Sequence, residues 1–504
     1  MSAFARELLG NINNFALVKN TKVYIVGGLL RDLYLGSAGR DLDFAVSGNA
    51  VHFAEGVAKK LGGSFILLDR LNGVARVVLE HQGEKWQVDF ATLKGFSIEE
   101  DLLMRDFTIN AMAVELPAYL NLLQKGLAPP PKRERWRWQD VVLDPCGGMA
   151  DLENKIIRAV SDYAFESDPL QILRGVRLAG QLKFALRPET ISLIENSRWL
   201  LHEVAGERIW EEFLGILALP ESYPWLALMD AIGLLSELFP FIEKLKVTAN
   251  NTEPSESVWV HSMKTYQILE DICREFGNSA LLLSTSRGEE LRALIVGHLH
   301  SPVGAGRQRY QLLKLAPLFH DAGKADTATV NDTGRTTFPG HHQEGLNYVS
   351  LAADRLKWSK HEESYLKSMV ENHLYPLYLF VNQPVSPAAI HRFFTKLGRD
   401  STDVLLLSLA DLTATYITGD KAHDLTRYRT FAGDMLNKYF FQADQYVSLP
   451  PLVNGDDLIA ELGIAPSKTL GELLKRITEA QVRGEVASRE EAINYARNIL
   501  GKLV

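Results

Sequence analysis

The sequence has few cysteines and no long hydrophobic segment, and these two shortages exclude several classes of protein. Only Cys146 and Cys273 occur among 504 residues, which excludes a disulfide framework and predicts a reducing compartment. No apolar run approaches the roughly 18 residues that indicate a membrane span. The N-terminal segment Met1–Asn20 lacks a continuous apolar core. We therefore predict a cytoplasmic protein without a signal peptide or membrane contact.

The composition has no strong bias. Hydrophobic residues make up 46% and charged residues 23% of the chain, proportions typical of a globular protein. The net charge is −8, so the overall cationic excess of many nucleic-acid-binding chains is missing. A local basic face could still bind RNA. The length is sufficient for roughly two to four domains.

The segment Val23–Val46 contains the most informative pattern, VYIVGGLLRDLYLGSAGRDLDFAV. Its first residues, Val23–Val26, predict a buried strand. Gly27 and Gly28 would let the backbone approach a phosphate at the start of the next helix, where free N–H groups favour anions. Arg31 lies one turn further and can donate to the same phosphates.

Two carboxylates follow in the same segment. Asp41 and Asp43 are two residues apart on a predicted strand, so both side chains point to one face. Such oxygen ligands suit Mg²⁺, which often also binds substrate phosphates. Together with the glycine pair, they indicate a metal-dependent site for a nucleoside triphosphate.

A third carboxylate, Asp89, lies on a predicted hairpin. Val74–Leu79 and Trp86–Phe90 are apolar runs joined by a glycine-containing turn, the pattern of two antiparallel strands. Asp89 in the second run completes a metal site of three carboxylates, or it faces solvent, or it pairs with Arg76.

The Val23–Val46 segment resembles the opening motif of the class II tRNA nucleotidyltransferase and poly(A) polymerase family, GGxxRD…DxD. Later motifs of that family are matched in the same order by EDLLMRDFTINAMA at Glu100–Ala113, DPCGGMAD at Asp144–Asp151, DPLQILRGVRLAGQLKF at Asp168–Phe184 and ERIWEEF at Glu207–Phe213. The resemblance implies that Asp41 and Asp43 hold Mg²⁺. It also implies a nucleotide site made of Gly27, Gly28, Arg31, Arg105, Asp106, Asn110, Asp168, Gln171, Arg174 and Arg177.

One departure from the family pattern concerns base selection. The family segment EDxxR, whose Asp and Arg form a protein template for the incoming base, is here Ser167-Asp168-Pro169-Leu170-Gln171. Asp168 is retained, but Gln171 carries no charge and reaches less far than arginine. The catalytic residues are therefore expected to be present, while the rule that selects CTP or ATP is open.

The second half of the chain resembles the HD phosphohydrolase superfamily. The adjacent pair His320-Asp321, predicted to lie on a helix, has a histidine upstream and an aspartate downstream. Imidazole and carboxylate ligands suit Ni²⁺, Mn²⁺, Fe²⁺ or Zn²⁺, and Asp321 could bridge two metals. The resemblance implies a centre made of His261, His320, Asp321, His341, His373 and Asp411. His342 is a neighbouring alternative to His341.

A basic and aromatic segment, Lys132–Trp138, follows three prolines. Cations next to indole rings suit phosphate contact and base stacking in RNA. A solvated insertion with incidental charge is the alternative. The residues expected to bind RNA are Lys132, Arg133, Arg135 and Arg137.

We therefore predict an α+β multidomain protein with a nucleotidyltransferase head containing a mixed sheet (1–120), a helical neck that binds nucleotide and RNA (121–250), an HD domain (256–420) and a helical tail (421–504). The expected function is template-independent transfer of CMP or AMP from CTP or ATP to the 3′ end of tRNA, with a second HD phosphatase or phosphodiesterase activity. The alternatives are an HD hydrolase with a degenerate head and a poly(A) polymerase acting on other RNA 3′ ends. The motifs do not distinguish CCA, CC, A and poly(A) addition.

Overall fold

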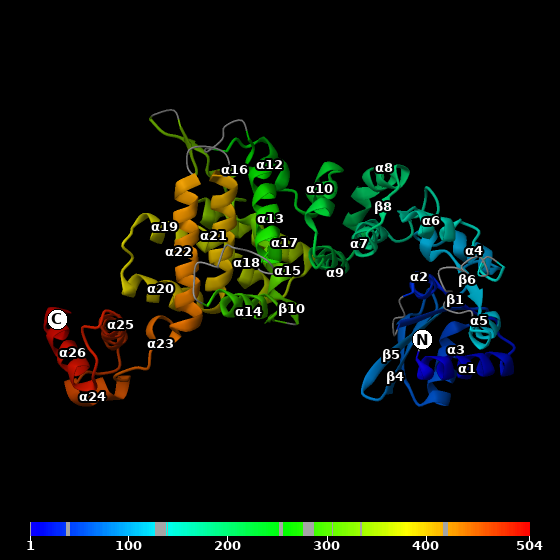
Figure 1. The fold of residues 1–504 in the computed structure, drawn as a ribbon, viewed down its shortest axis with the longest axis horizontal. Helices are drawn as coiled ribbons and strands as arrows, with labels where there is room; N and C mark the ends of the chain where they lie inside the picture. The colour runs from blue at the N-terminus through cyan, green and yellow to red at the C-terminus, as the bar shows by residue number, and fades with distance from the viewer. Residues whose placement is uncertain are drawn as a thin grey trace. The chain divides into compact units, whose positions relative to one another are not determined.

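The structure is a computed structural model, which describes residues 2–36, 41–126, 138, 140–250, 256–275, 287–304, 306–332, 335–416 and 422–503. These residues form two compact units, Met1–Val204 and Ala205–Val504. The first contains a mixed β-sheet with helices, and the second is almost entirely helical (Figure 1). The predicted α+β class is therefore confirmed, while the division into four domains stays a prediction.

The first unit is organised around a six-stranded sheet with the order β3-β4-β5-β2-β1-β6. Its strands are β1 (Val23–Val26), β2 (Asp41–Val46), β3 (Ser64–Asp69), β4 (Val74–His81), β5 (Glu84–Thr92) and β6 (Ala113–Glu115). Strands β2 and β5 are parallel, and the other neighbours are antiparallel. The predicted first strand and the predicted hairpin of β4 and β5 are both present.

One face of this sheet forms the core of the unit. Phe44, Val77 and Phe90 are at most 1% exposed, and they lie under helix α3 (Ala50–Leu61), which packs on β4 and β5 (Figure 1). The ring of Phe53 from α3 lies 5.4 Å from that of Phe90. Because side chains alternate along a strand, the residues between these apolar ones, including the predicted carboxylates, point to the opposite face.

Besides α3, the first unit contains helices and short elements beside the sheet and in the segment that follows it. They are α1 (Ala3–Val18), α2 (Gly27–Leu35), α4 (Ile98–Leu103), α5 (Leu116–Gln124), α6 (Gly148–Asn154), α7 (Gln171–Leu182), α8 (Pro188–Ser197), the short 3₁₀ turns at Thr108–Asn110 and Arg198–Glu203, and the strand pair β7 (Ile156–Ile157) and β8 (Ala185–Leu186). Helix α2 begins directly after β1. Its first residue, Gly27, has a φ of 68°, a conformation that side chains disfavour.

The second unit is a set of packed helices. Between them the described residues form two short strand pairs, β9 (Pro302–Val303) with β10 (Arg307–Gln308) and β11 (Thr329–Val330) with β12 (Thr336–Thr337), and a 3₁₀ turn at Gly398–Asp400. In chain order its helices are α9 (Gly206–Leu217), α10 (Tyr223–Ala231), α11 (Leu234–Leu238), α12 (Ile242–Val247), α13 (Val258–Glu275), α14 (Gly288–Leu299), α15 (Arg309–Phe319), α16 (Lys324–Thr327), α17 (His341–Leu356), α18 (Lys360–Asn372), α19 (Tyr375–Val381), α20 (Pro387–Leu397), α21 (Ser401–Tyr416), α22 (Ala422–Phe441) and α23 (Ala443–Tyr446). Helices α13, α15 and α21 pack on one another at its centre.

A buried lysine ties the first helices of this unit to its centre. Lys314 on α15 is 1% exposed. Its ammonium group lies 2.7 Å from Glu270 Oε1 on α13 and donates to the carbonyl oxygens of Leu217 (2.9 Å) and Leu219 (2.7 Å). A buried charge is tolerated only when it is paired and hydrogen-bonded. This network therefore holds the end of α9 against α13 and α15.

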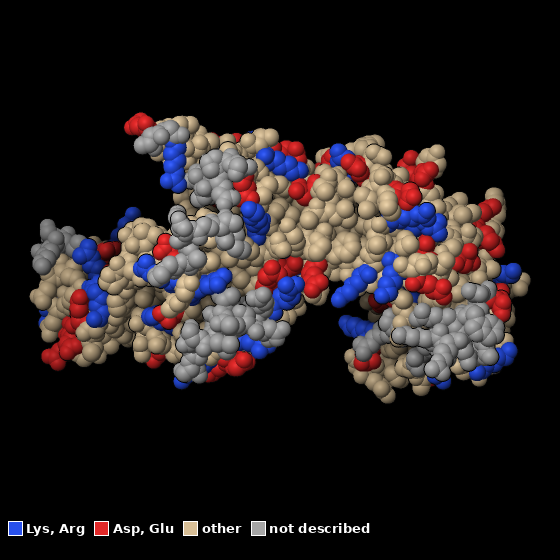
Figure 2. All heavy atoms as spheres, turned by 45° about the horizontal axis from the view of Figure 1, so that its top comes forward, with Lys and Arg blue, Asp and Glu red and all other residues tan. Residues whose placement is uncertain are grey.

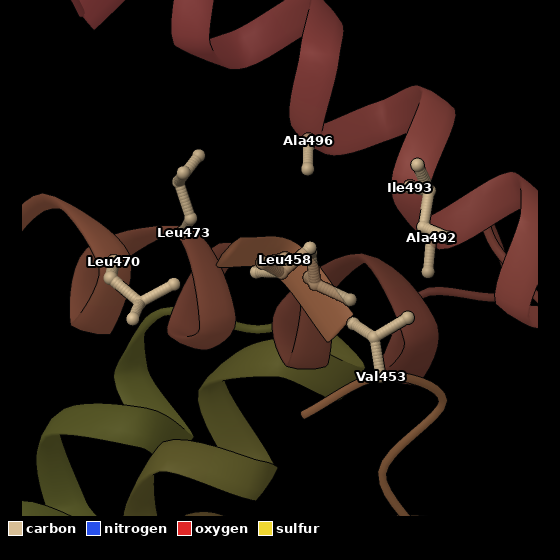
Figure 3. Packing of buried hydrophobic residues seen from close by; sticks show 8 residues of the cluster. Val453, Leu458, Leu470, Leu473, Ala492, Ile493 and Ala496 are labelled. Atoms are coloured by element: carbon tan, nitrogen blue, oxygen red, sulfur yellow. The ribbon is translucent and has the colours of Figure 1, made fainter. Parts of the chain in front are cut away.

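The last helices, α24 (Gly455–Leu462), α25 (Lys468–Val482) and α26 (Arg489–Leu503), share an apolar cluster of their own (Figure 3). Leu458 and Leu473 are fully buried in it, beside Ala492 and Ala496. The helical tail expected from the sequence is therefore present. Among the described helices, none combines the length and apolar character needed to cross a bilayer.

The DPCGGMAD segment positions the residues that precede the head's last strand. The carboxylate of Asp144 accepts from the backbone N–H groups of Gly148 (2.7 Å) and Met149 (2.9 Å) at the start of α6, which supplies partners for helix-terminal donors. A Cβ atom on Gly148 would overlap the carbonyl oxygen of Thr108. Glycine is therefore required for this close approach.

We expect Gly148→Ala to lower the free energy of unfolding by about 1–3 kcal/mol, because the added methyl meets backbone that cannot swing away. Gly10→Ala in α1 is the matched control, since no heavy atom lies within 4 Å of its Cβ position. That change should be neutral or raise stability by ~0.4–1 kcal/mol. Differential scanning calorimetry measures both, and equal transition temperatures for the two variants would contradict the packing argument.

Candidate active site and metal centre

Asp43 lies near the middle of the sheet, where β2 is flanked by β1 and β5. It stands opposite Asp89 of β5 in the parallel register. Asp43 Oδ2 lies 3.6 Å from the Cβ position on Gly27 and 3.8 Å from that on Gly28. The start of α2 therefore lies next to the carboxylate, and glycine is favoured at position 27 by its φ of 68°. Asp41, two residues earlier, is exposed on the same face.

The surroundings of Asp43 determine its charge. Burial raises the pKa of Asp43, and the carboxylate of Asp89 adds to this rise, while Arg105 and Arg174 oppose it. The guanidinium of Arg105 is itself held by Asp101, at 2.8 Å. A divalent cation at this position would favour the ionised form of Asp43. The carboxylate chemistry and the space kept open by the glycines fit Mg²⁺.

The other predicted nucleotide-binding residues are linked to one another through hydrogen bonds. Arg31 Nη1 donates to Asn110 Oδ1 (2.9 Å), and Asn110 Nδ2 donates to Asp106 Oδ1 (3.2 Å). Arg174 Nε lies 3.5 Å from the second oxygen of Asp106. Three segments far apart in the sequence are thereby joined at one place. Their cations are suitable donors to a polyphosphate.

Helix α7 carries the segment that departs from the family pattern. It begins at Gln171, whose backbone N–H donates to the carbonyl oxygen of Asp168 (3.1 Å). The side-chain oxygen of Gln171 is buried and has no hydrogen-bond partner. Further along, Arg177 Nη1 donates to Gln181 Oε1 (2.8 Å). Arg174 and Gln171 are three residues apart, so their side chains leave the helix on similar sides.

Asp89 shows both features that the sequence left open. It neighbours Asp43 in the sheet, and its two oxygens accept from Arg76 Nε (2.7 Å) and Nη2 (2.8 Å). Arg76 is its partner across the β4–β5 ladder. This bidentate ion pair offsets one of two neighbouring negative charges, and whether Asp89 also binds metal stays a prediction.

The six residues expected to form the second metal centre converge in the second unit. His261 of α13 and Asp411 of α21 are joined by a contact of 2.9 Å between His261 Nε2 and Asp411 Oδ1. His320 Nε2 lies 3.2 Å from Asp321 Oδ2 and 3.7 Å from Asp411 Oδ1. Ligand atoms of His261, His320 and Asp321 all lie within 4.8 Å of one another.

A second group of ligands shares Asp321. Its Oδ1 lies 3.4 Å from His341 Nε2 and 3.9 Å from His373 Nε2. These two Nε2 atoms lie 3.4 Å from each other. Asp321 therefore presents one oxygen to each group, the arrangement of a carboxylate that bridges two metals. His341, at 8% exposed, is the member of the His341–His342 pair that faces this group.

The ends of helices determine which nitrogen each imidazole offers. His320 and His373 follow the last residues of α15 and α18, and His341 begins α17. The sequence predicted His320 and Asp321 within a helix, but α15 ends at Phe319. The Nδ1 atoms donate to the carbonyl oxygens of Pro317, Phe338 and Val370, at 2.7–2.9 Å. Such bonds fix the tautomer and leave Nε2 as the metal ligand.

Electrostatics in the centre also fit cations. Burial lowers the pKa of His320, but Asp321 and Asp411 outweigh burial and raise it to about 10. Burial, assisted by His320, lowers the pKa of His373 to about 3, so this imidazole is neutral. His320 Nε2 and Asp321 Oδ2 are buried without a hydrogen bond of good geometry. Bound metal would supply the missing partners.

Two residues of these sites were not singled out as ligand partners from the sequence. Lys324 Nζ lies 2.6 Å from Asp321 Oδ2, and the spacing of three residues in HDAGK was the available signal. Arg76 was named only as an alternative partner of Asp89. The expected RNA contacts Lys132, Arg133, Arg135 and Arg137 lie outside the described residues. On the face shown in Figure 2, cations and carboxylates of the described residues are interspersed.

Three segments of the chain match known families. Residues 23–158 match the family described as the Poly A polymerase head domain, residues 183–246 an RNA- and SrmB-binding site of polymerase A, and residues 424–496 a tRNA nucleotidyltransferase domain 2. These matches include the sheet with its carboxylates and the helical tail.

Curated relatives match nearly the whole chain. A CC-adding tRNA nucleotidyltransferase of Geobacter sulfurreducens is 30% identical over 475 residues, 94% of this chain and 90% of the relative. An A-adding tRNA nucleotidyltransferase of Deinococcus radiodurans is 28% identical over 474 residues, 93% of either chain. Among solved structures, the Thermotoga maritima CCA-adding enzyme complexed with tRNA aligns with a TM-score of 0.63 at 21% identity, over 99% of this chain and 96% of that one. This last likeness concerns the fold.

Replacing His320 and Asp321 together by alanine should remove bound transition metal, because these residues supply ligands to both groups. His342→Ala is the control, since His342 is the neighbour that does not face Asp321. Elemental analysis of purified protein, with circular dichroism to verify folding, measures the difference. Equal Ni, Mn, Fe and Zn contents in the folded double variant and the wild type would refute the assignment.

Proposed function

The chain belongs to the family of tRNA nucleotidyltransferases and poly(A) polymerases, and from this premise we propose that it adds CMP or AMP to the 3′ end of tRNA. It is an enzyme of the nucleotidyltransferase class. The observation that carries the proposal is the approach of Gly27 and Gly28 to Asp43, next to Arg31 and Arg105. CTP and ATP are the expected donors, as in the complexes of CCA-adding enzymes that share the fold.

In this proposal Asp41 and Asp43 hold two Mg²⁺ ions. Bound Mg²⁺ would lower the pKa of the primer's 3′-hydroxyl and stabilise the leaving pyrophosphate. The backbone N–H groups at the start of α2 face the phosphates, where the helix terminus favours anions. The guanidinium groups of Arg31, Arg105 and Arg174 offset the charge that shifts to the pyrophosphate.

Base selection would depend on Asp168 and Gln171. An aspartate accepts from the exocyclic amine of cytosine or adenine and disfavours the carbonyl oxygens of guanine and uracil. An arginine at the second position could only donate, so the incoming base would also have to present an acceptor there. The carboxamide of Gln171 can donate or accept after a half-turn. The proposed enzyme therefore selects bases with one strict contact and one permissive contact.

A second, HD-type activity is supported by the two ligand groups around Asp321. We propose that they hold transition metals and hydrolyse a phosphate ester or cyclic phosphate. Two metals about 3.5–4 Å apart are the usual arrangement for such hydrolysis. The convergence of buried ligand atoms from Asp321, His341 and His373 within 4.8 Å of one another supports this activity, because such a set of imidazole and carboxylate ligands suits a transition metal.

Asp43→Asn should lower kcat for nucleotide addition at least about a hundredfold, because a metal ligand supplies several kcal/mol of transition-state stabilisation. Asp456→Asn, at an exposed position in α24, is the matched control and should leave kcat unchanged. Incorporation of radiolabelled CTP and ATP into tRNA that ends at the discriminator base, C or CC measures the effect. Near wild-type elongation by folded Asp43→Asn would show that the site is elsewhere.

Gln171→Arg should raise the preference for CTP and ATP over GTP and UTP about tenfold, since a forked donor separates bases by ~1–3 kcal/mol. Gln171→Lys adds the same charge without the fork and should raise it less. The measurement is the ratio of kcat/KM in competition between triphosphates. Unchanged ratios in both variants would exclude a template role for this position.

A further inference from the structure

The face of the sheet that carries Asp43 continues to the edge strand β3, whose pairing with β4 is regular from Ser64 to Leu67 and shifts between Leu67 and Asp69. The register aligns Asp43, Asp89, Arg76 and Ile66 in one row across β2, β5, β4 and β3. The neighbouring rows are Asp41, Gln87, Val78 and Ser64 on one side, and Ala45, Ala91, Val74 and Asp69 on the other. Directly paired residues point to the same face. The row that contains Asp43 therefore ends on Ile66, and Val74 and Val78 lie in the rows on either side of it.

These side chains are open to solvent. Ile66 is 43% exposed, the Arg76 side chain is 33% exposed, and Val74 and Val78 are half-buried. The opposite face of the same strands is covered by α3. Exposed aliphatic residues on an edge strand are usually avoided, because they invite association. Their place in line with the carboxylates of Asp43 and Asp89 indicates a ligand that shares that face.

The geometry of the reaction determines which ligand this is. Phosphoryl transfer proceeds in line, so the attacking oxygen enters on the side opposite the leaving group. The glycine pair, Arg31 and Arg105 lie on the β1 side of Asp43. The leaving pyrophosphate is therefore expected on that side, and the primer on the β5, β4 and β3 side.

We propose that the last unpaired nucleotides of the RNA primer lie across this face, on a primer shelf made of Ser64, Ile66, Val74, Arg76, Val78 and Gln87. The inference rests on the proposed nucleotidyl transfer at Asp43. From Asp43 on β2 to the far edge of the shelf on β3 there are three strand spacings, about 14 Å, the length of roughly four stacked nucleotides. Aliphatic side chains contact sugars and base faces, and this contact requires no particular base.

Arg76 has a second role on this shelf. Its Nε and Nη2 atoms hold Asp89, which uses one edge of the guanidinium. The Nη1 edge belongs to the other side of the fork and is a donor for a primer phosphate. The position of Arg76 between Asp89 and Ile66 therefore joins the carboxylates to the apolar end of the shelf.

The test compares two aspartates introduced next to each other on β3. Ile66→Asp places a carboxylate on the shelf and should raise the KM for tRNA at least about fivefold, as expected for a charge about 4 Å from a phosphate. Leu67→Asp is the control, because Leu67 is similarly exposed (36%) but pairs with Ala75 on the α3 side. It should leave the KM for tRNA unchanged. The KM for CTP should not move in either variant.

A photo-reactive benzoylphenylalanine at position 66 or 67 gives a readout independent of turnover. Full-length protein with the probe at 66 should cross-link to the last nucleotides of tRNA, and the probe at 67 should not. Cross-linking of position 66 to a second protein chain, or an unchanged tRNA KM in folded Ile66→Asp, would overturn the shelf. If the wild type adds no nucleotide to tRNA, the proposed function fails instead, and the two failures are distinguishable.

Discussion

The negative charge of Asp43 is partly buried in the middle of a sheet, and the charged groups around it are arranged to offset it. The next strand places a second carboxylate, Asp89, directly beside it, so burial and repulsion both raise the pKa of Asp43. Arg76 clamps Asp89, and Arg105 approaches from the other side, next to Gly27. Like charges this close persist only when cations offset them. The carboxylates therefore favour Mg²⁺ at this point, and bound Mg²⁺ would in turn bind the phosphates of a triphosphate.

The second unit satisfies the same constraint with different groups. Asp321 is 2% exposed, and burial alone would raise its pKa, but His320 and Lys324 lower it well below the usual value. The imidazoles of His320, His341 and His373 donate Nδ1 to carbonyl oxygens three residues earlier, which leaves their Nε2 atoms directed toward Asp321. The centre therefore depends on where helices end as much as on which residues it contains.

Strands and helices with regular spacing of apolar residues were predicted well from the sequence. The contacts between distant segments were predicted poorly. Val23–Val26 and the β4–β5 hairpin follow from apolar alternation and a glycine turn. Strand β3 was not predicted, because its apolar run is short and exposed on an edge. Motif order could not reveal that Asp43 and Asp89 share a register, since β2 and β5 are parallel strands separated in the chain by α3, β3 and β4. The end of α15 before His320 was also missed, because the first helix-breaking residue after it, Gly323, lies further along the chain.

Sequence identity over the whole chain does not reveal which nucleotide an enzyme of this family selects. Relatives that add CC and relatives that add A match this chain at similar identity, 30% and 28%. The choice is a difference in affinity of a few kcal/mol between nucleotides, which two or three contacts supply. In the proposed enzyme, a change at Gln171 would alter the choice of base while the fold and the metal ligands remain. The side-chain oxygen of Gln171 is buried without a hydrogen-bond partner, and an incoming base bound there would supply one.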